Sequence, residues 1–62
     1  MMLSLFEQIK QLEIDEFELM ERAYEHEHGT TGYVISDYCT FVQHGIMPQY
    51  LINYLLFLRG KS

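Results

Sequence analysis

Apolar residues recur at helical spacing from the start of the chain. Leu5, Ile9 and Leu12 follow one another at intervals of three and four residues, which places them on one face of a helix. Ser4 stands three residues before Glu7, the spacing of a capping box in which each side chain bonds a free backbone N–H. The pattern therefore predicts a helix that begins at Ser4.

The segment from Ser4 to His28 reads either as two helices or as one. Asp15 belongs to a residue type that caps helix N-termini, so a second helix could begin there. In the alternative, one helix covers the whole segment, because its apolar residues still share one broad face that only Glu13 and Glu16 interrupt. The sequence leaves both arrangements open.

A third helix is predicted from about Thr31 to His44, with the two threonines after Gly29 as its cap. One face is polar, and the residues of the other are Val34, Ile35, Tyr38, Cys39, Phe41 and Val42. We expect this face in the core, with Cys39 acting there as a small hydrophobic residue. This helix and the one before it both end in His-Gly, where glycine accepts the left-handed cap conformation and a cation meets the negative end of the dipole.

The last predicted helix begins at Pro48, a favoured first residue, and ends at Arg59 before Gly60. It is apolar almost all round: the residues of one face are Tyr50, Leu51, Tyr54, Leu55 and Leu58, and those of the other side include Ile52 and Leu56. A helix that is apolar on all sides needs to be buried on all sides. Either it is the central helix of the fold, or one side meets another molecule, and we favour the second.

These elements predict an all-α fold, a compact bundle of three to four short helices forming a single small domain over residues 1–62. A chain of 62 residues buries only about 60% of its unfolded surface, so its stability is marginal. Small scaffolds gain stability from disulfides, a metal or a partner, and a single cysteine excludes an internal disulfide. A metal or a second protein chain therefore remains as the possible source of added stability. A homodimer is one arrangement that supplies a second chain.

The charge of the chain argues against direct nucleic-acid binding. Four Lys and Arg residues stand against nine Asp and Glu, for a net charge of −5, and the scattered basic residues form no site for phosphate backbones. The last two helices have lengths that suit a helix–turn–helix unit, but the second displays Leu, Ile and Phe where base-reading side chains would lie. The longest apolar run, "YLLFL", is too short to span a bilayer, and the N-terminus lacks the basic region of a signal peptide. We expect a cytoplasmic protein without a membrane partner.

Three glutamates, Glu18, Glu21 and Glu25, share one face of the predicted second helix. Like charges at this spacing cost a helix a few tenths of a kcal/mol each. The ordinary interpretation is a charged surface that keeps a small protein soluble. The functional interpretation is a negative face that steers a basic partner into place, or in its sharpest form a nucleic-acid mimic.

The stretch "YEHEHGTTGY" is the one part of the chain that suggests metal binding. His26 and His28 point about 200° apart on a helix, so they do not bind one ion together. Glu25 and His28 form a Glu-x-x-His pair in line with Glu18 and Glu21, and carboxylate-bridged di-metal bundles use such a pair. The line faces away from the apolar side, however, so we interpret it as a solvated helix end and predict no metal or other cofactor.

The predicted function is that of a non-enzymatic protein–protein interaction module, a small adaptor or regulatory inhibitor that covers a functional surface of a partner. No nucleophile–base arrangement, phosphate-binding loop or metal spacing indicates catalysis. The alternatives are an acidic nucleic-acid mimic and, less favoured, a dimeric carboxylate and histidine metal-binding bundle. The predicted binding residues are Tyr50, Ile52, Tyr54, Leu56 and Phe57 in the last helix and Glu18, Glu21 and Glu25 in the acidic stripe.

Overall fold

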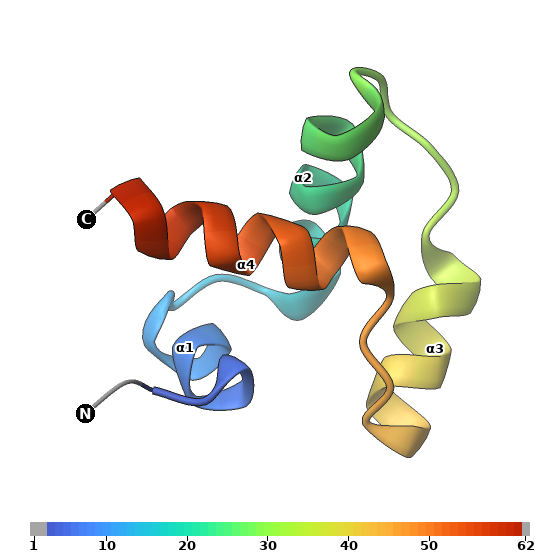
Figure 1. The fold of residues 1–62 in the computed structure, drawn as a ribbon. Helices are drawn as coiled ribbons and strands as arrows, with labels where there is room; N and C mark the ends of the chain where they lie inside the picture. Colours follow the sequence, from blue (N-terminus) through green and yellow to red (C-terminus); the bar gives the residue numbers. More distant parts are fainter. Residues whose placement is uncertain (1–2, 62) are drawn as a thin grey trace.

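The computed structural model describes residues 3–61 (Figure 1). Their helices are α1 (Leu5–Gln11), α2 (Glu16–His28), α3 (Ile35–His44) and α4 (Gln49–Lys61). No strand occurs in this range. The Cα radius of gyration is 11.1 Å, near the value of about 11 Å for a compact chain of this length. The prediction of a compact all-α fold with three to four short helices is confirmed.

Helix α4 crosses the molecule between α2 and α1, and α3 stands to one side (Figure 1). Leu51 and Leu55 of α4 are fully buried, so this line of α4 is the centre of the core. The other buried apolar residues are Ile9, Leu19, Met20, Ala23, Val34 and Phe41. The core therefore lies mainly where α4 meets its two neighbours.

Local capping signals divide the first half of the chain into two helices. The Glu7 N–H donates to Ser4 Oγ at 3.2 Å and the Ser4 N–H donates to Glu7 Oε1 at 3.1 Å, which confirms the predicted capping box. The Phe17 N–H donates to Asp15 Oδ1 at 2.7 Å, so Asp15 caps α2. Between them Glu13 adopts a left-handed φ of 56°, which ends any continuous helix and decides the question in favour of two.

Glycines end α2 and α3 as predicted, with φ of 76° at Gly29 and 70° at Gly45. The predicted start of α3 at Thr31 is wrong, because the helix begins at Ile35 and its cap, Val34, makes no side-chain hydrogen bond. The residues before it carry the chain away from α2, and Gly32 passes so close to the Tyr24 ring that a Cβ would lie 2.0 Å from it.

The predicted end of α4 at Arg59 is also wrong. The helix continues through Gly60 to Lys61. A glycine inside a helix lowers its stability by only about 1 kcal/mol. The helix can therefore continue through Gly60, and the residues on both sides of this glycine are helical.

The predicted core face of α3 is only partly correct. Val34 and Phe41 are buried, but Ile35, Cys39 and Val42 are exposed. The six apolar residues of this face span about 160° around the helix axis, which is more than the rest of this small chain covers. The expectation that Cys39 lies in the core is therefore wrong.

Candidate functional site

The side of α4 that faces away from its buried line carries apolar residues beside the exposed polar Asn53. Leu56 is 50% exposed and Phe57 41% exposed, and Ile52 beside them is half-buried. We call Ile52, Leu56 and Phe57 the α4 outer face. All three were predicted as binding residues; Leu56 and Phe57 face solvent, and Ile52 lies at the edge of the buried side.

Two other predicted binding residues, Tyr50 and Tyr54, are half-buried and make contacts within the chain. The Tyr50 hydroxyl donates to Asp37 Oδ2 at 2.8 Å, and its ring meets Tyr24 edge-on at 5.3 Å. Burial, followed by the bond to Asp37, raises the pKa of Tyr50 above its usual value. Tyr54 lies 5.3 Å from the ring of His26. Both tyrosines thus connect α4 to its neighbours rather than extend from it.

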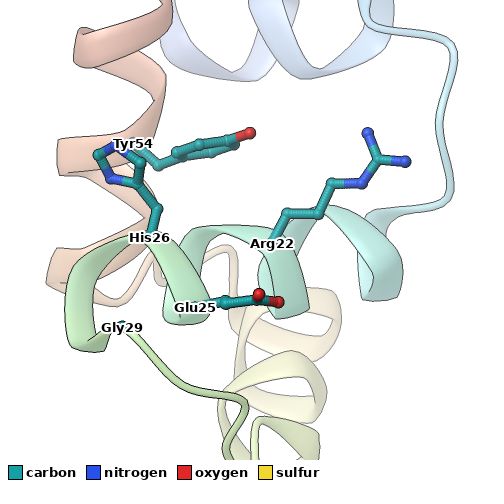
Figure 2. A pocket seen from close by; sticks show the side chains of 5 residues that line it. All are labelled: Arg22, Glu25, His26, Gly29 and Tyr54. Carbon is teal, nitrogen blue, oxygen red and sulfur yellow. The ribbon is translucent and has the colours of Figure 1, made fainter.

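An open pocket of about 480 Å³ lies between α2 and α4, lined by Arg22, Glu25, His26, Gly29 and Tyr54. Figure 2 shows His26 and Tyr54 beside one another and Arg22 reaching away from them. The His26 ring also lies 4.3 Å from the ring of Phe57, and Lys61 Nζ lies 5.2 Å from the Phe57 centroid. The pocket therefore adjoins the α4 outer face and mixes charged with aromatic groups.

The acidic stripe lies on the solvent-exposed side of α2. Glu18, Glu21 and Glu25 are all exposed. Glu18 pairs with Arg22 at 3.2 Å, but both side chains are more than half exposed, at 53% and 56%, so the pair adds little stability. The negative charge is concentrated in one part of the chain, since eight of the nine acidic residues fall in residues 7–27 and none follows Asp37.

The proposed metal ligands do not form a cluster. His28 packs its ring 4.3 Å from that of Tyr24 and 6.4 Å from that of Tyr50. Within residues 3–61, no three His, Cys, Asp or Glu side chains are grouped so that they could hold an ion. The Glu-x-x-His pair of Glu25 and His28 therefore has no further ligand grouped with it in the described part of the chain.

A second exposed apolar surface lies on α3 and was not predicted. Its residues on the helix are Ile35 (47% exposed), the exposed Cys39 and Val42 (57%), and Ile46 (57%) follows in the loop after the helix. We call these four residues the α3 outer line. The sequence signal was the width of the apolar face, about 160°, because one neighbouring helix covers a narrower arc than that.

No helix within the described range has both the length and the apolar character needed to cross a membrane. Comparison of the chain with protein-family models, with curated proteins and with solved structures gave no match. The features of the molecule that indicate a function are therefore the two exposed apolar surfaces and the acidic stripe.

Proposed function

We propose that this chain is a non-enzymatic protein–protein interaction module, a small adaptor or inhibitor that covers a functional surface of a partner protein. One observation carries the proposal. Helix α4 stabilises the fold through Leu51 and Leu55, which are 0% exposed, while Leu56, the next residue, is 50% exposed. Its apolar character therefore exceeds what the fold of one copy uses.

The α4 outer face has the composition of an interface centre. The centres of protein interfaces are enriched in aromatic residues and depleted of charged residues. The side chains of Ile52, Leu56 and Phe57 are likewise apolar and uncharged, and one of them is aromatic. Covering the exposed half of a large apolar side chain contributes roughly 1 kcal/mol. A stable complex usually covers about 800 Å² on each partner, so we expect these residues to anchor a larger contact that includes polar residues at its edge.

The acidic stripe on α2 favours a partner that has a basic surface. Glu18, Glu21 and Glu25 lie on the exposed side of α2, where Glu18 forms a solvent-exposed ion pair with Arg22. A partner with a basic surface would be steered toward them, which increases its rate of association. The second candidate function, a nucleic-acid mimic, would depend on these carboxylates alone and not on α4.

An affinity capture with paired variants tests the proposal. The tagged chain is expressed in the cells that produce it, as wild type, as Leu56→Glu and as Thr31→Glu, a control that adds the same charge at an exposed loop position. We expect Leu56→Glu to reduce captured partner by about tenfold or more, because a buried charge costs more than the 1.4 kcal/mol of a tenfold change. The control should retain the partner, and circular dichroism should show that both variants are folded.

A charge-neutralised variant separates the two candidate functions. This triple variant combines Glu18→Gln, Glu21→Gln and Glu25→Gln. If the chain is an interaction module, the variant should still bind its partner but associate with it more slowly. If this triple variant loses the partner while Leu56→Glu keeps it, and if binding by the wild type weakens steeply with salt, the mimic is the better account and the α4 proposal is wrong.

A further inference from the structure

The pocket between α2 and α4 is the place where the acidic stripe and the α4 outer face meet. Glu25 lines the pocket and belongs to the acidic stripe. His26 also lines it, and the ring of His26 lies 4.3 Å from the ring of Phe57 in the α4 outer face. A partner that contacts both surfaces therefore passes over this pocket.

The charges around the pocket favour a cation as its ligand. The positive lining residue, Arg22, is paired with Glu18 at 3.2 Å and reaches away from the rings of the pocket (Figure 2). The negative lining residue, Glu25, forms no ion pair within residues 3–61. The pocket also reaches Gly29 at the end of α2, where the last carbonyl groups give a helix a partial negative charge. An anion would meet two sources of repulsion here.

Two rings form a surface against which a cation can stack, and we call His26 and Tyr54 the aromatic wall. Their centroids lie 5.3 Å apart. The neighbouring ring already carries a cation, because Lys61 Nζ lies 5.2 Å from the Phe57 centroid, within the range of about 6 Å for a cation–π contact. Lys61 is not among the residues that line the pocket, so the aromatic wall is left for a ligand.

We propose, building on the function proposed above, that this pocket binds an arginine side chain of the partner protein. Glu25 and His26 lie about 100° apart around α2, so an extended side chain that crosses the pocket contacts both. The flat guanidinium stacks against the aromatic wall and donates its outer N–H groups to the Glu25 carboxylate. A lysine ammonium lacks the flat face and the fork of donors, and arginine is enriched at interfaces where lysine is depleted.

A titration with the side chain alone tests the pocket without any partner protein. N-acetyl-arginine amide is added to the isotope-labelled full chain at constant ionic strength, and backbone amide shifts are followed by two-dimensional NMR. We expect saturable shifts at His26, Gly29 and Tyr54 with a dissociation constant on the order of 10 mM, as suits a single weak contact. N-acetyl-lysine amide should bind at least about threefold more weakly. No saturable shift at these residues, or equal binding of the two amides, would overturn the proposal.

Two glutamate variants separate the pocket from the general negative charge of α2. Glu25→Gln should raise the dissociation constant for the arginine amide by about threefold or more, because a charge-assisted hydrogen bond becomes a neutral one. Glu21→Gln removes the same charge one turn earlier, at an exposed position that does not line the pocket, and should bind the amide like the wild type. Equal weakening in the two variants would indicate diffuse attraction and contradict the proposal.

Two histidine variants test the aromatic wall in the same titration. His26→Ala removes an exposed ring of the wall and should weaken binding of the arginine amide by about threefold. His44→Ala removes an exposed ring at the end of α3 and should leave binding unchanged. Equal binding by the two variants would contradict stacking against the wall.

The titration and the affinity capture fail independently of one another. If the arginine amide does not bind while Leu56→Glu still removes the captured partner, the arginine site is wrong and the proposed function stands. If the amide binds as expected while Leu56→Glu keeps the partner, the arginine site is supported and the role of α4 in the proposed function is wrong.

Discussion

Helices α2 and α4 bury the apolar side chains at which they meet, whereas α3 leaves half of its apolar face in solvent. Leu55 of α4 is 0% exposed and Leu19 of α2 is 1% exposed, while Val42 of α3 is 57% exposed. Helix α4 packs against both α1 and α2, but α3 lies at the edge of the molecule (Figure 1). Position in the fold, and not apolar content, therefore decides which residues stabilise the monomer and which are left for other contacts.

The largest expected effect comes from truncating the buried side of α4. Leu55→Ala should lower the free energy of unfolding by about 2–5 kcal/mol, since it removes buried methyl groups and leaves a cavity. A domain of this size has a total stability of roughly 3–9 kcal/mol. Urea unfolding followed by circular dichroism measures the change.

Leu56→Ala is the matched control for that prediction. The side chain is one residue away and 50% exposed, so its truncation should cost less than about 1 kcal/mol. If the two alanine variants lose equal stability, the distinction between the inner line and the α4 outer face is wrong.

An intermediate effect is expected where α1 joins α4. The buried Gln8 donates from Nε2 to the Leu55 carbonyl at 2.9 Å and accepts from Arg59 Nε at 2.6 Å, and Arg59 also donates to the Leu3 carbonyl. Gln8→Ala should lower stability by about 1–3 kcal/mol, because buried polar groups lose a partner. Gln11→Ala, at an exposed position of the same helix, should change stability by less than about 0.5 kcal/mol.

A smaller effect, with a defined pH dependence, is expected at the start of α1. The Ser4 backbone N–H and then the Ser4 hydroxyl lower the pKa of Glu7. Because the folded pKa lies below the unfolded one, this stabilisation is present above the usual glutamate pKa and is lost as pH falls through the lowered value. Ser4→Ala removes the hydroxyl cap and should cost about 1 kcal/mol, whereas Glu7→Gln should remove the pH-dependent part, as chemical unfolding at neutral pH and at about pH 3 would show.

The smallest effect on stability is expected on the α3 outer line. Val42→Ala should change the free energy of unfolding by less than about 0.5 kcal/mol, since the side chain is mostly in solvent. In the same dilute sample, Cys39 should react with a thiol reagent without prior unfolding, because it is exposed. A thiol that reacts only after denaturant is added would show that Cys39 is buried and would contradict the exposed position of this residue.

Features set by a few neighbouring residues could be predicted from the sequence. The Ser4 capping box and the left-handed glycines at Gly29 and Gly45 are local, because the residues that make each bond are close in the chain. The Asp15 cap is equally local but was only one of two open alternatives. The all-α class follows from helical periodicity in the same way. The exposed position of Leu56 was also expected, from the apolar perimeter of its helix.

Features set by distant parts of the chain could not be predicted. Glutamate has no preference for the left-handed φ of 56° that Glu13 adopts, so one helix could not be distinguished from two. The exposure of Cys39 depends on how much of α3 its neighbours cover, and the roles of Tyr50 and Gln8 depend on partners 13 and 51 residues away. Each of these is a tertiary effect that periodicity does not encode.

The central claim is that the apolar faces left open by one copy are covered by another protein. Hydroxyl-radical footprinting of the purified chain at low concentration, and again in an extract of the cells that produce it, tests this directly. Tyr33, a loop residue that is 78% exposed and belongs to neither surface, is the internal reference. The account predicts that labelling of Leu56 and Phe57 relative to Tyr33 falls several-fold in the extract; equal relative labelling in both samples would contradict it.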